Sequence, residues 1–309
     1  MMTFSISSAA NGKYEVRAAL TQGEKSAEKS EDFVLLGEGG QLDSGGTAPG
    51  GDAPIAVDPP GLATAEQTAD RPSQEELDRI LVGARESALD YADALPNLIC
   101  RETTQRLYDQ TGKGDWRLED TYFELLTFLN HEEDRTLAGA RTTEEMPERR
   151  TDMFSTGQFG MSLTGIFRSE SKAMFTWKET GTLRGEPAEV FDYRVEQQNS
   201  NFLLNASGGA AKVSYHGRIY IGQASHEVKS LTMITDEQPN KFPIRKAAIR
   251  VDYDYVAIND HDYILPVSAQ VVTGVGGNLL KRNDLTFSNF RRFGSTERIV
   301  GTASAQVPQ

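Results

Sequence analysis

Apolar and polar residues alternate along most of the chain after residue 98, with the two-residue period of β-strands that bury one face. The alternation is clearest in residues 191–196, 212–221 and 246–255. Strands of this kind, joined by short turns such as Asn259-Asp260, are typical of an antiparallel meander with one solvated face. We therefore predict about nine strands between Leu98 and Ile299.

A helical period replaces the alternation in the segment before Pro96. Ser73 and Glu76 have the spacing of a capping box, which marks a helix N-terminus. The residues that follow place apolar side chains on one stripe, namely Leu77, Ile80, Leu81, Ala84, Ala88 and Tyr91. We expect a leading helix that packs this stripe on a core and ends before Pro96.

Residues 122–129 depart from the strand pattern because both faces of this segment are apolar, so a second element must cover it. The candidate is a helix over residues 155–167, where Ser155 and Gln158 form another capping box. The predicted fold is α+β and mainly antiparallel β. It is a long curved meander sheet, or half-barrel, with the leading helix and this inserted helix on its concave face.

Apolar side chains of the two-faced strand and the inserted helix are predicted to converge on that concave face. These residues are Phe123, Leu125, Phe159, Leu163, Ile166 and Phe167. They form either a packed core or the lining of a groove for a hydrophobic ligand, since apolar concavities with few polar groups are the usual form of such sites.

The N-terminal quarter of the chain has a different organisation. Short alternating segments in residues 1–36, with a hairpin signal at Asn11-Gly12, predict an incomplete remnant of a β-sandwich whose other strands lie upstream. Residues 37–72 are rich in Gly and Pro without periodicity, so we expect a disordered linker there. Residues 73–300 then form the half-barrel domain, and residues 301–309 a disordered tail.

Composition narrows the classes of function. The net charge is −13, from 32 Lys and Arg against 45 Asp and Glu, which disfavours nucleic-acid binding because that binding depends on neutralising phosphates. The single cysteine, Cys100, excludes an internal disulfide and a cysteine-type zinc site, and we expect it to be buried in a strand. No apolar run approaches the ~20 residues of a transmembrane helix.

The residues that could act in catalysis or bind a metal do not form a recognisable catalytic motif, and we predict no cofactor and no metal. The four histidines lack the spacing of metal ligands. Asp252 and Asp254 share one strand face, as a general acid and base pair would, but we expect them instead to pair with Arg250, Arg218 or Lys229 on a solvated face. An enzyme would need Asp252, Asp254 and His216 around one cleft.

The order of elements resembles the lipoprotein-carrier fold of LolA and related periplasmic sensor domains. Residues 95–299 resemble a family of bacterial extracytoplasmic proteins that has no established activity. The matching segments are Leu95-Pro96-Asn97 with Cys100, residues 155–160, residues 215–220, Phe242-Pro243-Ile244, residues 252–255, Leu265-Pro266, and Arg282-Asn283 with Phe287 and Phe293. Residues 1–36 resemble the end of an immunoglobulin-like module. The resemblance implies the fold and a location in the periplasm or cell envelope, and it supplies no catalytic residues.

Two hypotheses of function follow. The first is a non-enzymatic extracytoplasmic module that binds an acyl chain, a lipoprotein or an apolar peptide. The alternative is a structural or interaction domain whose core is filled by its own helices, and which docks an envelope protein through a sheet edge or the polar face of residues 246–254. The space between the second helix and the sheet distinguishes the two hypotheses.

Overall fold

The computed structural model describes residues 12–22, 25–35, 55–64, 71–130, 132–137, 161–206, 209–238 and 242–292. The chain divides into two compact units, Met1–Gly50 and Gly51–Gln309. In the first unit, β1 (Gly12–Gln22) and β2 (Lys25–Leu35) form an antiparallel hairpin in which Gln22 pairs with Lys25. Strands were expected in this segment. Gly12 begins β1 and pairs with Leu35, whereas Asn11 of the predicted Asn11-Gly12 turn lies outside the described residues.

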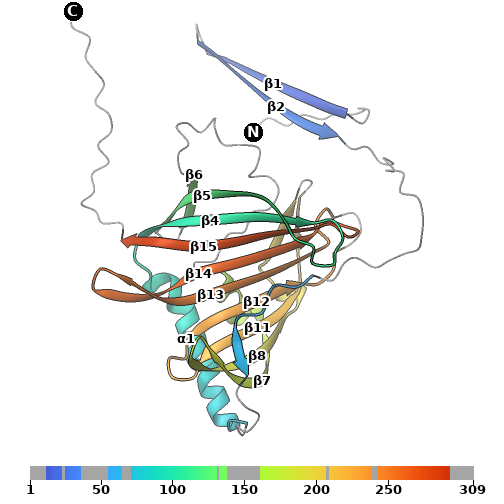
Figure 1. Cartoon of the computed structure of the whole chain (residues 1–309). Coiled ribbons are helices and arrows are strands. Elements are labelled where there is room, and N and C mark those ends of the chain that lie inside the picture. The colour runs from blue at the N-terminus through green and yellow to red at the C-terminus, as the bar shows by residue number, and fades with distance from the viewer. Residues whose placement is uncertain are drawn as a thin grey trace, which may run out of the picture. The chain divides into compact units, whose positions relative to one another are not determined.

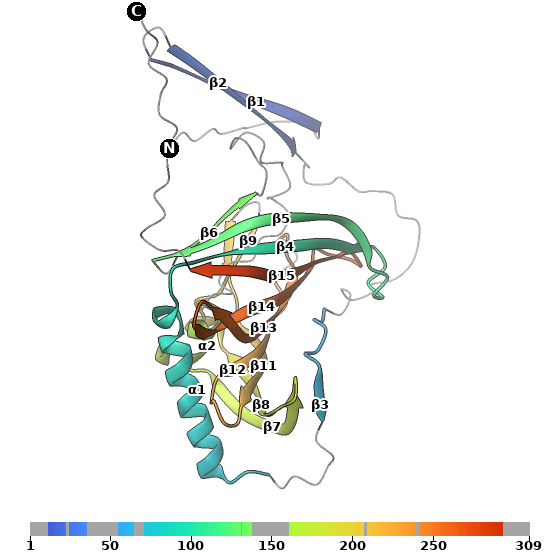
Figure 2. The same cartoon turned by 60° about the vertical axis from the view of Figure 1, so that its left-hand side comes forward.

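The second unit contains one antiparallel sheet of eleven strands in the order β3-β7-β8-β11-β12-β13-β14-β15-β4-β5-β6 (Figures 1 and 2). The strands are β3 (Leu62–Thr64), β4 (Leu98–Asp109), β5 (Arg117–Leu129), β6 (Glu132–Leu137), β7 (Met174–Leu183), β8 (Glu186–Val195), β11 (Tyr215–Gly222), β12 (Val228–Thr235), β13 (Lys246–Ile258), β14 (His261–Gly274) and β15 (Leu280–Arg292). A separate hairpin pairs β9 (Leu203–Ala206) with β10 (Gly209–Lys212). From β7 to β15 the strands of the sheet follow one another as a meander, and β4 to β6 extend the sheet beyond β15. The sheet ends at β3 and β6 without closing, which confirms the predicted half-barrel.

The leading helix is α1 (Gln74–Ala94), and it begins as predicted. The Oγ of Ser73 accepts a hydrogen bond from the backbone N–H of Glu76 at 3.2 Å. The helix ends at Leu95, whose extended backbone is the conformation that a following proline imposes. Its buried stripe, with Leu77, Ala84 and Tyr91 among its members, packs in one core with residues of the sheet. Figure 2 shows α1 beside the sheet.

The second helix is α2 (Met161–Phe167), followed by the 3-10 turn η3 (Ser169–Ser171). The predicted start at Ser155 lies outside the described residues. The Oγ of Ser171 donates to the carbonyl oxygens of Ile166 and Arg168, which ties the end of α2 to η3. After this turn Lys172 takes a left-handed backbone with φ 45°, and β7 begins two residues later.

A single large core lies between the two helices and the concave face. It contains the alternating apolar residues of β8, β11 and β13 that the sequence pattern predicts to face inward, such as Phe191, Ile219 and Val251. Cys100 is fully buried there, as expected. The helices thus supply the cover that this face of the sheet requires.

Residues 55–60 correct the prediction of a linker that extends to residue 72, and we call this segment the strap. Ile55 is buried against Ala248, Val272 and Leu280 on the convex face of the sheet. The backbone N–H of Asp58 donates to Gln270 at 2.7 Å, and its carboxylate pairs with Arg282 at 2.9 Å. Beyond the strap, β3 pairs with β7. The strap and β3 therefore belong to the folded unit.

The strap also corrects the prediction that residues 246–254 present a solvated polar face. Arg250 donates to the carbonyl oxygen of Asp58, and the Arg250 side chain is 16% exposed. Asp252 is buried and accepts from Ser230 and Ser268. Because Ala248 is apolar and lies on the same face, this part of the sheet needs a cover, and the strap provides it.

Candidate functional site

The structure does not bring all of the predicted concave residues together. Phe123 and Leu125 are 40% and 42% exposed, because the alternate residues Leu126 and Phe128 of the same strand are the ones buried in the core. Phe123 and Leu125 therefore lie on the convex face, where the guanidinium of Arg101 sits 3.9 Å from the centre of the Phe123 ring. Their predicted place on the concave face is wrong. Phe159 lies outside the described residues.

The three predicted residues of α2 do lie on the concave side, and they fill it. Leu163, Ile166 and Phe167 are all buried in the core. Between α1, Leu163 and the sheet the remaining space is about 10 Å³, beside Ala88 and Tyr91. This is the volume of at most one water molecule. The centre of the half-barrel is therefore packed.

A hollow of about 210 Å³ remains at one end of this packing, where α1 passes α2, η3 and the start of β7. We call it the interhelical hollow. Its apolar lining comprises Leu81, Val82, Ile166, Phe167, Ala173 and Phe175. The Phe167 and Phe175 rings, which both line the hollow, stack with their centres 5.4 Å apart and their planes inclined by 20°. Two of the six predicted site residues, Ile166 and Phe167, thus line an open space.

Three basic side chains complete the lining of the interhelical hollow. Arg85 comes from α1, Arg168 follows α2, and Lys172 follows η3. All three residues are exposed, and in the described part of the chain none of them pairs with a carboxylate within 4 Å. Glu170 is the nearby acid. The pKa of its carboxyl is lowered mainly by its own backbone N–H and by Ser169, and further by Arg168 and Arg85.

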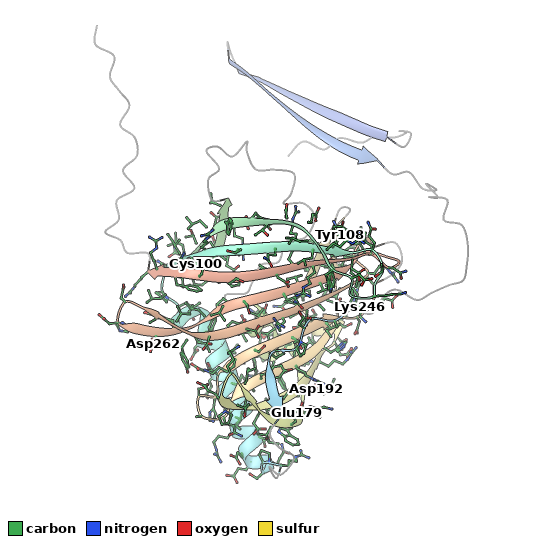
Figure 3. The ribbon with its side chains drawn as sticks, in the orientation of Figure 1. Cys100, Tyr108, Glu179, Asp192, Lys246 and Asp262 are labelled. Atoms are coloured by element: carbon green, nitrogen blue, oxygen red, sulfur yellow. The ribbon has the colours of Figure 1, made fainter. Side chains whose placement is uncertain are left out.

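A larger groove of about 690 Å³ lies on the convex face, between the strap and strands β7, β8, β11 and β12. We call it the outer groove. Asp192 on β8 is labelled in Figure 3 and forms an ion pair with Arg218 at 2.8 Å. Arg194 pairs with Asp236 at 2.8 Å. Burial raises the pKa of Asp236, but hydrogen bonds from Arg194 and Ser214 outweigh it and lower the pKa.

The cations of the outer groove are therefore already paired with carboxylates of the chain, unlike those around the interhelical hollow. The floor of the outer groove also contains a position that only glycine can occupy. A Cβ at Gly217 would lie 2.0 Å from the carbonyl oxygen of Thr232, so only glycine fits there. That carbonyl accepts from the hydroxyl of Tyr193 at 2.9 Å, which satisfies it.

The candidate acid and base pair is structural. Asp252 forms an ion pair with Arg250 at 3.0 Å, the pairing that the sequence offered as an explanation, and Asp254 pairs with Arg184 at 3.4 Å. His216 lies in the outer groove, which Asp252 and Asp254 do not line. Over the described ranges, no group of three or more His, Cys, Asp or Glu residues could hold a metal ion. Over the same ranges, no helix is long and apolar enough to cross a membrane.

Comparison with known proteins yields similar solved structures but no family assignment. The sequence matches no protein-family model and no curated protein. A domain from Vibrio parahaemolyticus, described as that of an outer membrane lipoprotein-sorting protein, is 12% identical with a TM-score of 0.34. A DUF1329 family protein from Desulfovibrio piger is 7% identical with a TM-score of 0.33. Each match covers 71% of this chain and 94% of the other. The assignment of the fold rests on the strand order and the two helices described above.

Proposed function

We propose that the unit from the strap to β15 is a non-enzymatic, extracytoplasmic binding module that takes a short hydrophobic group in the interhelical hollow. The observation that carries this proposal is a hollow with apolar walls, Ile166 and Phe167 among them, that remains open in the described part of the chain beside the close packing of α1 on Leu163. Apolar walls with a few polar groups at the mouth are typical of small-molecule sites. The extracytoplasmic setting is the one that the sequence resemblance implies.

The size of the hollow limits the ligand. At about 210 Å³ it is smaller than the ~300 to 1,000 Å³ of sites for drug-sized ligands. A short acyl chain or one apolar side chain of a peptide fits this space better than several long chains. Each buried methylene contributes about 0.8 kcal/mol, and association consumes several kcal/mol, so we expect weak binding.

Filling the hollow tests the proposal. Ala173 lines the hollow, so Ala173→Trp should occupy it and abolish saturable binding of a fluorescent medium-chain fatty acid. Ala210→Trp is the matched control, because Ala210 is exposed on β10 and lines neither cavity. Thermal unfolding of both variants verifies that they fold. Equal saturable binding by the two variants would contradict the proposal.

A second candidate function is a structural domain with a filled core. It is favoured by the residual space of about 10 Å³ under α1, and by four exposed apolar residues along the convex side of β5: Leu118, Phe123, Leu125 and Leu129. An envelope protein or a second copy of the chain would contact this stripe. Sedimentation of the whole chain over a dilution series tests the second copy. Self-association that Phe123→Ser with Leu125→Ser abolishes supports it, and a monomer at every concentration excludes it.

A further inference from the structure

We infer that the ligand of the interhelical hollow carries an anionic head, so that its class is a single-chain carboxylate or phosphate amphiphile. This inference rests on the proposed function and concerns the same site. It depends on the basic side chains around the hollow, because the apolar walls alone do not discriminate between head groups.

Three basic side chains converge on the interhelical hollow. Arg85 on α1 precedes Arg168 by 83 residues and Lys172 by 87, yet the fold brings all three to one hollow. Glu170 is the acid near them, and its own backbone N–H and Ser169 are the first causes of its lowered pKa. The described lining of the hollow holds these three basic side chains and no acid, in a chain whose net charge is −13.

These three cations differ from those of the outer groove in their ion pairing within the described residues. In the outer groove, Arg194 and Arg218 each hold a carboxylate at 2.8 Å, so their charge is used within the chain. Among the described residues, the three cations of the interhelical hollow hold none within 4 Å. An anion at the mouth would therefore gain attraction without displacing an existing ion pair.

Apolar and charged side chains lie at different sides of the interhelical hollow. Ile166 and Phe167 are 0% and 3% exposed at the closed side, whereas the three cations are exposed at the solvent side. A molecule that places its tail on the apolar wall presents its head to these side chains. Phosphate and carboxylate heads match this arrangement equally, because both accept hydrogen bonds from Arg and Lys.

The test compares ligands with one tail and different heads. Decanoate, decyl phosphate, decanol and decylamine are titrated into the whole chain by calorimetry at low salt. The inference predicts that the two anions bind about tenfold more tightly than decanol, and that decylamine binds most weakly. Raising the salt to about 0.5 M should remove the preference without weakening decanol, because screening acts on charge alone.

Charge reversal on α1 supplies the matched variants. Arg85→Glu should reduce the affinity for decanoate about tenfold and leave decanol unchanged, because Arg85 lines the hollow. Arg79→Glu reverses an exposed charge on the same helix outside the lining, and should leave both affinities close to those of the wild type. If Arg85→Glu does not fold, Lys172→Gln replaces it.

The outcomes separate the inference from the proposed function. Equal binding of the four ligands, or the tightest binding by decylamine, overturns the anionic head and leaves the hydrophobic site intact. Binding to none of them overturns both. Binding to phosphatidylglycerol vesicles without binding to decanoate or decyl phosphate assigns the cations to a membrane surface, and it also overturns the inference of a single-chain ligand.

Discussion

The strap offers the sharpest test of the fold, because the sequence predicts a flexible linker there, whereas the structure packs it on the convex face of the sheet. Ile55 is 8% exposed and packs on Ala248, Val272 and Leu280. Ile55→Ala removes three carbons. At about 0.8 kcal/mol for each buried carbon the loss is about 2.4 kcal/mol, near the lower end of the ~2 to 5 kcal/mol seen for such truncations. This is a large fraction of a typical stability of about 5 to 15 kcal/mol.

Urea unfolding followed by tryptophan fluorescence measures this effect. Both tryptophans of the chain, Trp116 and Trp177, lie in the second unit, and Trp116 contacts the cluster that contains Ile55. With a slope of about 1 to 3 kcal/mol per molar urea, the midpoint should fall by roughly 1 M. Leu118→Ala is the control, because Leu118 is 57% exposed on β5, and it should shift stability by less than about 0.5 kcal/mol. An Ile55→Ala variant as stable as this control would refute the packed strap.

Three further predictions concern the same unit. Gly217→Ala should destabilise it by about 3 kcal/mol or more in the same urea assay, because the new Cβ meets the carbonyl oxygen of Thr232, and unchanged unfolding would contradict this. Burial raises the pKa of the Cys100 thiol to about 12, so a thiol reagent should modify it only in denaturant, and rapid modification of the folded chain would show that the core is open. A hydrogen bond from Gln270 is the main cause that lowers the pKa of Asp58. The ionised Asp58 therefore stabilises the fold fully above its ordinary pKa of 3.8, and this stabilisation is lost as the pH falls through the lowered pKa. Asp58→Asn should reduce the difference in urea midpoint between pH 5 and pH 3, and an equal difference in both proteins would contradict this prediction.

The architecture follows from periodicity. The stripe on α1 and the alternation in β8, β11 and β13 each assign residues to the core without ambiguity, because only one face of each element is apolar. The capping spacing of Ser73 also fixes the start of α1 to within one residue.

The face of β5 could not be predicted in the same way, because both of its faces carry apolar residues. The inner set includes Glu124, which is 3% exposed, and the outer set includes Phe123 and Leu125. A prediction from side-chain polarity therefore places the wrong face of β5 in the core. The neighbouring strands explain the inversion, since Glu102 on β4 and Arg135 on β6 are also buried and pair at 2.9 Å. A buried charge pair on the concave side is not visible in the sequence of β5 alone.

The strap and the cations of the interhelical hollow could not be predicted from the sequence for a different reason. Both depend on contacts between residues far apart in the chain, such as Asp58 with Gln270, or Arg85 with the segment after α2. A signal for the strap was present, because Ala248 and Val272 place small apolar residues on a face that otherwise reads as polar. No comparable pattern marks the cations, because Arg85, Arg168 and Lys172 each belong to an ordinary exposed surface when considered singly.

The proposed function requires a short hydrophobic group to occupy the interhelical hollow. A decisive experiment is to titrate the whole chain with straight-chain carboxylates of increasing length, from six to sixteen carbons. At about 0.8 kcal/mol for each methylene, affinity should rise roughly fourfold per added carbon while the chain fills the hollow, and should then become constant at a medium length. An affinity that continues to rise to sixteen carbons, or no saturable binding at any length, would contradict the proposed function.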